Sequence, residues 1–443
     1  MPLKQAVLAF LRHGRSATRL MGIALDRRRE LGIAGIVKRP IGRTRAPGAA
    51  AAPSGSPLPP RRAAFDVIYA IGYWPGEPKR YRVFNPAEAL SARGYAVHVM
   101  PFDVIDDIRR RRWQAQALVL FRAEYDRLVG IEKALDYARK AGMRIVYDID
   151  DLVFDPNLAD RIDALGRMGP HQRRQFLAAM SRRRRLMQEC DFFTAATAPL
   201  ARAAALLGRP SIVVPNALNV AQLRLAAEIA AFPPPTSDAV RIGYFSGSPT
   251  HQRDFAQCEP ALLQVMRRHS AVRFRLVGHL DLGPSWQEFG ERVERIGLLP
   301  PHALLRSIAE TDVNLAPLEL GNSFCEAKSE LKFFEAAAVG VPTVASATEP
   351  FRAAIEDGVT GFLARDLWQW HDALEFLLAS PSRRRQVGAA ARASALSRYT
   401  PDRLAPQIAA ALQLIQSDWT PSGISTSRKN RPKECAVGTG GGA

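Results

Sequence analysis

Four aspartates fall within eight residues of the stretch Tyr147–Asp155, which reads YDIDDLVFD: Asp148, Asp150, Asp151 and Asp155. Enzymes use acid-x-acid patterns of this kind to hold a divalent metal, because hard cations prefer carboxylate oxygens as ligands. The same carboxylates can orient or deprotonate a hydroxyl group if they reach it at about 3 Å. They can also cap backbone N–H groups in a turn. Taken alone, the stretch leaves all three interpretations open.

Two lysines and a glutamate in the stretch Asn322–Ser346, NSFCEAKSELKFFEAAAVGVPTVAS, form a second group with useful spacing. A helix that begins near Lys328 places Lys328, Lys332 and Glu335 on one face, because their spacing is i, i+4 and i+7. Ser329 can cap the start of this helix. Lysines there suit a bound anion, and a carboxylate one turn deeper can accept from two ribose hydroxyls. An exposed amphipathic face with one lysine–glutamate pair is the plainer alternative.

A turn of small residues follows the apolar segment 240–246. Gly247 and Ser248 lead toward a helix, and backbone N–H groups in such a turn can face phosphate oxygens. Arg253, and with it His251, can add positive charge. The pattern matches neither standard glycine-rich phosphate motif, so a tight strand-to-helix turn explains it equally well.

Strands and helices alternate through the middle of the chain. Apolar segments that fit buried strands lie at 65–73, 95–102, 117–122, 144–150, 192–197, 211–219, 240–246, 272–279, 313–318 and 342–346, with helical segments between them. Apolar strands separated by helices indicate parallel sheets that are covered on both faces. We therefore predict an α/β fold with two doubly wound, Rossmann-like domains that face each other across a cleft. Ligands are expected beyond the carboxyl ends of the strands.

The domain boundaries follow from changes in composition. A segment with three prolines, 232–238, interrupts the alternation and separates a first domain at 65–235 from a second domain at 236–417. The second domain includes the C-terminal helices. Residues 1–64 are a basic, largely disordered arm and linker, and residues 418–443 are a disordered tail.

The net charge of +18 comes mainly from the ends of the chain. Residues 1–64 contain 13 Lys and Arg against two acidic residues, so the folded middle carries little excess charge and a nucleic-acid partner is not expected. The four cysteines lie far apart without C-x-x-C spacing, which argues against disulfides or zinc and fits a reducing cytosol. No run approaches the ~20 apolar residues of a membrane-spanning helix. We expect a cytoplasmic protein whose basic segments can contact the anionic inner face of the cell membrane.

The block SELKFFEAAAVGVPTVAS, with VVPNALN and the YFSGS turn upstream, resembles the group-1 (family 4-like) glycosyltransferases of GT-B fold that build bacterial surface polysaccharides. The resemblance covers roughly residues 65–400 and is more specific in the second domain. It implies that the second domain binds a nucleotide-sugar donor and the first domain binds a glycan or lipid-linked glycan acceptor. Most of the family retain the anomeric configuration and need no metal. We therefore expect no metal and no cofactor, with the nucleotide sugar as a co-substrate.

The donor side departs from the family pattern at several positions. The common E-x7-E pair would place its first glutamate at Ala327, whereas Glu335 matches the second. Ser248 takes the place of the usual arginine, and Arg253 lies one residue beyond the usual lysine. The predicted donor-binding residues are Gly247, Ser248, Arg253, Lys328, Ser329 and Glu335.

The acceptor side is predicted from the aspartate-rich stretch. Many relatives end the corresponding strand with T-I-H-D-L, so D-I-D-D-L places Asp150 where they have histidine and keeps Asp151. The resemblance thus implies that Asp150 is the catalytic residue that orients or deprotonates the acceptor hydroxyl. Asp151 is an acceptor-side candidate, and so is Arg82 at the mouth of the first strand.

Two other functions remain open on the same fold. A sugar-nucleotide 2-epimerase shares the architecture and needs no separate acceptor. A degenerate, non-catalytic GT-B partner subunit is the other alternative, because Ala327 and the missing arginine and lysine depart from the family pattern.

Overall fold

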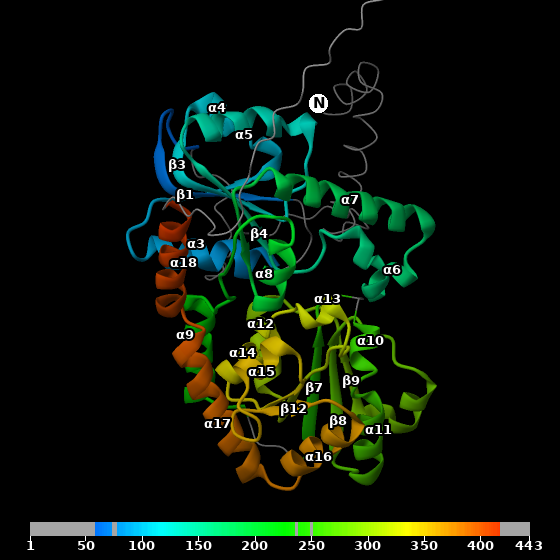
Figure 1. Ribbon diagram of the computed structural model, residues 1–443. Coiled ribbons are helices and arrows are strands. Elements are labelled where there is room, and N and C mark those ends of the chain that lie inside the picture. The colour runs from blue at the N-terminus through cyan, green and yellow to red at the C-terminus, as the bar shows by residue number, and fades with distance from the viewer. Residues whose placement is uncertain (1–57, 73–77, 235–237, 249–250, 417–443) are drawn as a thin grey trace, which may run out of the picture. The chain divides into compact units, whose positions relative to one another are not determined.

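The computed structural model describes residues 58–72, 78–234, 238–248 and 251–416, which belong to one compact unit (Figure 1). Most of the predicted N-terminal arm, the predicted C-terminal tail and three residues of the predicted linker lie outside the described residues. The first half contains β1 (Ala64–Ile71), η1 (Arg80–Phe84), α3 (Asn85–Ser91), β2 (Val97–Pro101), η2 (Phe102–Val104), α4 (Asp107–Arg111), β3 (Gln114–Phe121), η3 (Arg127–Val129), α5 (Ile131–Lys140), β4 (Arg144–Ile149), η4 (Pro156–Arg161), α6 (Asp163–Arg167), α7 (Pro170–Gln188), β5 (Phe192–Ala195), α8 (Ala198–Ala205), β6 (Ser211–Val213) and α9 (Val220–Ala231). The second half contains β7 (Val240–Ser246), α10 (Gln252–Phe255), α11 (Glu259–Arg268), β8 (Val272–Gly278), η5 (Pro284–Arg292), β9 (Val293–Ile296), α12 (Pro301–Ala309), β10 (Val313–Ala316), α13 (Ser323–Glu326), α14 (Leu331–Ala338), β11 (Thr343–Ser346), α15 (Glu349–Ala354), β12 (Phe362–Ala364), α16 (Leu367–Leu378), α17 (Pro381–Arg398) and α18 (Pro401–Gln416).

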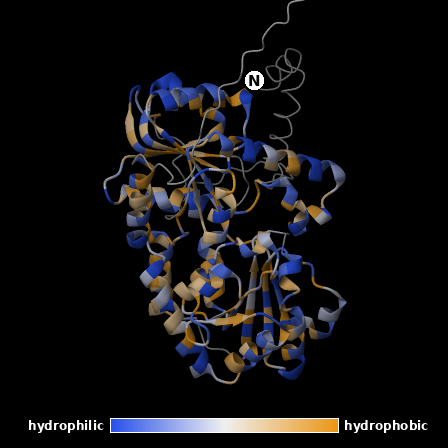
Figure 2. Cartoon of the chain, in the orientation of Figure 1, coloured by the Kyte–Doolittle hydropathy of each residue, from blue (hydrophilic) through white to orange (hydrophobic). Residues whose placement is uncertain are grey.

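The first sheet is parallel, with strand order β2-β1-β3-β4-β5-β6. The interior strand β1 buries four successive residues, Val67 to Ala70, because helices cover both faces. Ile68 and Ala70 join one apolar cluster, whereas Val67 and Tyr69 join another on the opposite face, and the hydrophobic colouring in Figure 2 follows these strands. The strand order reverses between β1 and β3, and ligands of open α/β sheets bind at such a switch point.

The second sheet is also parallel, with order β12-β11-β10-β7-β8-β9. Ile242 and Tyr244 of β7 pack into a core with α11 and α16, and Phe245 packs on the other face with residues of α12 and α14. Here the order reverses between β7 and β10, so this sheet has its own switch point. The predicted α/β architecture with two doubly wound domains is confirmed.

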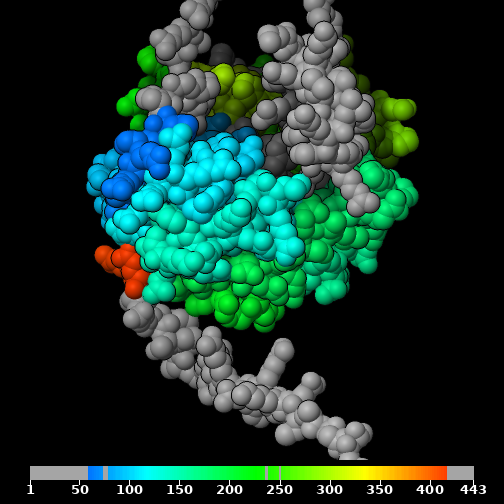
Figure 3. All heavy atoms as spheres, turned by 90° about the horizontal axis from the view of Figure 1, so that it is seen from above, coloured from blue at the N-terminus to red at the C-terminus, as the bar shows by residue number. Residues whose placement is uncertain are grey.

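Two helices each pack against the domain other than the one to which the predicted boundaries assign them. Helix α9 packs against α12, although the predicted boundary places α9 in the first domain. Helix α18 packs against α3, although the predicted second domain includes it, and Figure 3 shows its red end beside the first domain. Six apolar residues of α18, from Leu404 to Ile415, belong to the first sheet's core. The two places where the chain passes between the halves are joined by a hydrogen bond from Leu218 N to Tyr399 O of 2.9 Å.

Most predicted strands and helices are present, with one difference that matters for the site. The helix predicted to begin near Lys328 begins at Leu331, after a separate short helix α13. Lys328 and Ser329 therefore lie in the connection between two helices. Ser329 does not cap α14, whose N-cap residue is Glu330.

Candidate active site

Two glycines allow chain segments at strand ends to approach closely, one at the switch point of the first sheet and one between β7 and β8 of the second. At Gly72, after β1, a Cβ atom would lie 2.4 Å from the carbonyl oxygen of Arg122, which follows β3. At Gly278, which has φ +92° and ends β8, a Cβ atom would lie 2.0 Å from the carbonyl oxygen of Ser246. Only glycine fits either place, so the ends of these strands can converge.

Arg122 forms ion pairs with the two aspartates that directly follow β4, Asp150 and Asp151. The Arg122 guanidinium, which is 1% exposed, donates from Nε to Asp150 and from Nη2 to Asp151. Burial raises the pKa of Asp150 to about 6, with Arg122 opposing this rise and Asp151 adding to it. Asp155 accepts from Asn157 N at 3.2 Å, so this member of the stretch caps a turn. The four carboxylates therefore have different roles.

Arg82 is buried rather than presented to an acceptor. Its guanidinium is 2% exposed and forms a two-bond ion pair with Asp148, at 2.9 and 2.6 Å. Asp148 also accepts from the Thr194 hydroxyl at 2.7 Å, and Arg82 donates to Asn216 at 3.1 Å. This geometry contradicts the predicted contact of Arg82 with an acceptor, because these buried groups already use its N–H donors. Arg82 instead braces the strand that carries the aspartates.

Ser329 joins this bracing network from the other half of the chain. Its hydroxyl accepts from Asn216 Nδ2 at 2.9 Å, so Asn216 bridges Arg82 and Ser329. Nearby, the Thr197 hydroxyl donates to the Ala327 carbonyl oxygen at 2.8 Å. The segment between α13 and α14 is thus anchored to the carboxyl edge of the first sheet.

Asp254 is the centre of a cluster around the predicted donor-binding residue Lys328, and it was not among the residues predicted from the sequence. It is 2% exposed and accepts from Lys328 Nζ at 3.0 Å, from His251 Nδ1 at 2.9 Å and from Cys325 Sγ at 3.1 Å. Although burial opposes it, the Lys328 ammonium holds the pKa of Asp254 well below its usual range. Burial, reinforced by Lys328, lowers the pKa of His251 to about 4, so the imidazole is neutral at pH 7. Lys328 therefore forms a largely buried ion pair with Asp254.

Lys332 and Glu335 share one face of α14, one turn apart. The Lys332 ammonium lies 4.1 Å from the centroid of the Tyr244 ring, and among the described residues it has no hydrogen-bond partner. Burial lowers the pKa of Lys332 to about 8. Glu335 accepts a hydrogen bond from the Tyr81 hydroxyl of the first half, which in turn accepts from Gln222 at 2.8 Å. The predicted donor carboxylate therefore lies where the two halves meet.

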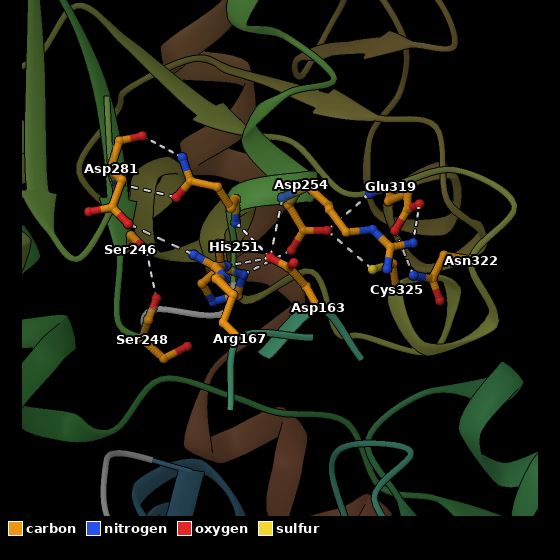
Figure 4. Close-up of polar contacts among 12 residues, drawn as sticks. Asp163, Arg167, Ser246, Ser248, His251, Asp254, Asp281, Glu319, Asn322 and Cys325 are labelled. Atoms are coloured by element: carbon orange, nitrogen blue, oxygen red, sulfur yellow. Dashed lines mark hydrogen bonds and ion pairs between the residues drawn. The ribbon is translucent and has the colours of Figure 1, made fainter. Parts of the chain in front are cut away.

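The turn after β7 is contacted by the first half of the chain. Gly247 is exposed, and Ser246 donates its hydroxyl to the Ser248 carbonyl at 3.0 Å. Figure 4 shows the Asp163 carboxylate reaching from α6 to the start of α10. It accepts from the backbone N–H groups of Gln252 and Arg253 at 3.1 and 3.3 Å.

Arg253 contacts residues of both halves of the chain. Its guanidinium pairs with Glu319 at 2.5 Å and donates to the Asp160 carbonyl at 3.5 Å. Asn322 donates to Glu319 at 2.7 Å and to the Arg161 carbonyl at 2.8 Å. The start of α10, beyond the turn predicted to hold phosphate, is therefore held by carboxylates of the protein.

Arginines in both arginine runs form ion pairs with acidic side chains. Within Arg109–Arg112, three arginines pair with Asp106 or Asp107. Within Arg182–Arg185, two arginines pair with Glu124. These pairs reduce the positive charge that either run can offer to a membrane.

The described residues contain neither a metal cluster nor a membrane-spanning helix. In the part of the chain that the structure describes, no group of three or more His, Cys, Asp or Glu side chains is arranged to hold a metal ion. No helix in that part is both long enough and apolar enough to cross a membrane.

Several site residues were not predicted from the sequence. They form hydrogen bonds or ion pairs with predicted site residues and belong to no sequence motif of their own. Arg122 directly follows an apolar strand, which is the position where ligand-contacting residues are expected. Asp254 lies three residues after His251, a spacing that brings side chains together on a helix. Asp163, Tyr81 and Asn216 have no comparable local signal, because their partners lie more than 80 residues away.

Comparison with known proteins agrees with this architecture. Residues 253–410 match the family model described as "Glycosyl transferase-like". The chain is 30% identical over 207 residues to phosphatidyl-myo-inositol mannosyltransferase of Mycobacterium leprae (strain TN), a match that covers 46% of this chain and 53% of that protein. The match thus spans about half the length of this curated relative.

Several solved structures share the fold at low sequence identity. Sucrose-phosphate synthase from Thermosynechococcus elongatus superposes with a TM-score of 0.55 at 16% identity, covering 79% of this chain and 99% of that one. A glycosyltransferase from Rickettsia africae gives 0.53 at 9% identity, covering 81% and 100%. Anabaena Alr3699/HepE in complex with UDP and glucose gives 0.52 at 14% identity, covering 79% and 99%.

Two doubly wound parallel sheets with a switch point each define a protein of the GT-B class. The chain thus has the GT-B fold, and its residues 253–410 are similar to a glycosyl transferase-like family, in line with the resemblance seen in the sequence.

Proposed function

We propose that the chain transfers a sugar from a nucleotide-diphosphate sugar to a hydroxyl of a glycan or lipid-linked glycan. One observation carries the proposal: the aspartate-rich end of β4 and the lysine-bearing segment before α14 lie together. Their proximity is shown by the contacts of Asn216 with Ser329 and of Thr197 with Ala327, at 2.9 and 2.8 Å. This proximity supports the proposal that an acidic acceptor side and a cationic donor side serve one reaction.

In the proposed reaction, the bond between the sugar's anomeric carbon and the phosphate oxygen breaks. Its electron pair leaves with the nucleoside diphosphate. A new bond forms between the anomeric carbon and the acceptor oxygen, and Asp150 orients that hydroxyl and takes its proton. By the family resemblance, the anomeric configuration is retained.

The donor side supplies fixed positive charge for the leaving diphosphate. The Lys332 ammonium is buried and the Lys328 side chain is only 13% exposed, and a cation acts more strongly away from water. The buried Lys332 ammonium, without a hydrogen-bond partner among the described residues, adds charge without a paired carboxylate. Glu335 is proposed to accept from the ribose hydroxyls, with Tyr81 fixing the carboxylate.

Metal independence is part of this proposal, and the same charges support it. The arginine-paired aspartates are poor metal ligands, and the lysines can take the role of a metal at the leaving group. Activity is therefore expected to survive an excess of EDTA, measured as sugar transfer before and after chelation. Loss of transfer with EDTA and recovery with Mn²⁺ would contradict metal independence.

Asp163 occupies backbone amides that a donor phosphate would need. Its replacement in Asp163→Asn is expected to tighten donor binding by about five- to tenfold, because a charge-assisted contact that competes with phosphate is lost. Calorimetry with the nucleotide sugar measures this affinity. Asp160→Asn is the matched control, since Asp160 pairs with Arg173 and is exposed. Weaker binding in Asp163→Asn would show instead that Asp163 closes the site over the donor.

The donor class is tested by a thermal-shift panel of UDP-, GDP- and dTDP-sugars. A mannosyl donor should be included, because the curated relative is named a mannosyltransferase. A ligand at ~100 times its dissociation constant adds roughly 2.7 kcal/mol to the free energy of unfolding. Incubation with the donor alone separates an epimerase, which would change the sugar without an acceptor. Binding without transfer to any acceptor would favour a non-catalytic subunit.

A lipid-linked acceptor would place the protein at the cytoplasmic face of the membrane. Val104 and Leu128 are exposed on neighbouring turns of the first half and line one surface with Lys133, although Asp103, Asp106 and Asp107 line it too and Asp106 pairs with Arg110. Apolar and basic side chains together favour an anionic lipid surface. Co-sedimentation with anionic and neutral vesicles tests this part of the proposal.

A further inference from the structure

Arg122 has a backbone conformation that arginine rarely adopts. Its φ is +45°, and among the described residues only Arg62 and Arg112 share this property outside glycine. Non-glycine residues in this region are strained and concentrate at functional sites. Gly72 packs against the Arg122 carbonyl, where any larger residue would collide.

This conformation aims the Arg122 side chain along the carboxyl edge of the first sheet. The guanidinium spans two carboxylates, with Nε on Asp150 Oδ1 and Nη2 on Asp151 Oδ2. The guanidinium is almost completely buried, whereas the Asp150 and Asp151 side chains are 11% and 30% exposed. The Arg122 guanidinium is thus shielded from solvent, whereas the two carboxylates that it pairs with remain accessible. A fork-shaped cation fixes both the distance between its acceptors and their orientation.

We propose that Arg122 is a positioning residue for sugar transfer, which sets the orientation and the charge of the Asp150 carboxylate. The inference rests on the proposed function, because it assigns Asp150 to the acceptor hydroxyl. Nothing in the geometry requires Arg122 to touch a substrate. Its effect is exerted through Asp150.

The charges around Asp150 support this role. Burial raises the pKa of Asp150 and the neighbouring Asp151 raises it further, while Arg122 and the more distant Arg82 lower it. Arg82 is itself neutralised by Asp148. Lys328 of the second half interacts with Asp151. Arg122 is therefore the main cation that keeps Asp150 ionised near neutral pH, and its loss moves the pKa of Asp150 upward.

The sharpest test compares Arg122→Gln, Arg122→Lys and the wild type in the full-length protein. In the wild type, kcat is expected to rise with pH through about 6, where Asp150 loses its proton. In Arg122→Gln, this acidic limb should move up by at least about one pH unit, which lowers kcat at pH 6 by at least about fivefold. The KM for the donor should stay unchanged. Arg122→Lys keeps the charge but not the fork, so its limb should move less while its plateau kcat still falls.

Arg139→Gln is the matched control, because Arg139 forms an exposed ion pair with Glu189 away from the site. An unchanged acidic limb and plateau in folded Arg122→Gln would overturn the proposal. If that variant does not fold, a wild-type plateau in Arg122→Lys would overturn it equally.

A second readout separates this inference from the proposed function. Carboxylate carbon NMR can follow the titration of Asp150, assigned with Asp150→Asn, without any turnover. If the wild type transfers no sugar from any donor, the proposed function fails. In that case an unchanged Asp150 titration in the Arg122 variants would still refute the inference, and an upward shift would support Arg122's control of that charge.

Discussion

Asp150→Asn is expected to lower the turnover number by about 10²–10⁴-fold, the usual contribution of a positioned general base. The amide keeps the size of the carboxylate but cannot take a proton at neutral pH. Donor affinity should stay within about twofold, because the donor-side residues lie on the other sheet. Turnover is measured as sugar transfer at saturating donor, and donor affinity by calorimetry.

Asp155→Asn is the control for this experiment. Asp155 belongs to the same aspartate-rich stretch but caps Asn157 and pairs with Arg184 at 3.2 Å. Its replacement should leave turnover nearly unchanged. Equal turnover in Asp150→Asn and the wild type would remove Asp150 from the mechanism, whatever the fold.

Arg82→Met is expected to lower the free energy of unfolding by about 3–5 kcal/mol, because it leaves the buried Asp148 without its cation. Both side chains of this pair are nearly inaccessible, at 1% and 5%. Urea unfolding followed by circular dichroism measures the change. The double variant Arg82→Met with Asp148→Asn should recover part of the loss, because no buried charge is then left unpaired.

The outcome separates two roles for Arg82. An arginine that binds an acceptor would, when replaced, raise the acceptor KM and leave stability almost unchanged. Arg93→Met is the control, since its ion pair with Asp402 is exposed and contributes little, about 1 kcal/mol or less. A stability loss no larger than that of the control would return Arg82 to the acceptor site.

Local sequence was sufficient to predict the two parallel sheets. A parallel strand buried on both faces must be apolar along its whole length, and such runs can be recognised from the sequence alone. The same rule placed Asp150 and Gly247 after strand ends. Because strand ends are where α/β folds bind ligands, the two stretches selected by their chemistry lie at or beside the switch points.

Helix boundaries near the site were less predictable. The spacing of Lys328, Lys332 and Glu335 suits one helix, yet the chain forms a separate turn at Ala327–Glu330. Contacts from the first half hold this turn, through Asn216 on Ser329 and Thr197 on Ala327. Tertiary hydrogen bonds therefore outweighed the local pattern, as they often do over short segments.

By itself, the sequence determined the fold class, the strand ends at which the site lies and the kinds of charge present there. Only the tertiary structure decided which charges pair. Arg82 with Asp148 and Lys328 with Asp254 are separated by 66 and 74 residues, and Tyr81 reaches Glu335 across 254. Hydrophobic periodicity is a local property that every segment carries, whereas an ion pair depends on the position of two distant backbones. For this reason the aspartates of YDIDDLVFD resemble one cluster of carboxylates in the sequence. In the folded chain, Asp148 pairs with Arg82, the candidate base Asp150 pairs with Arg122, and Asp155 caps a turn.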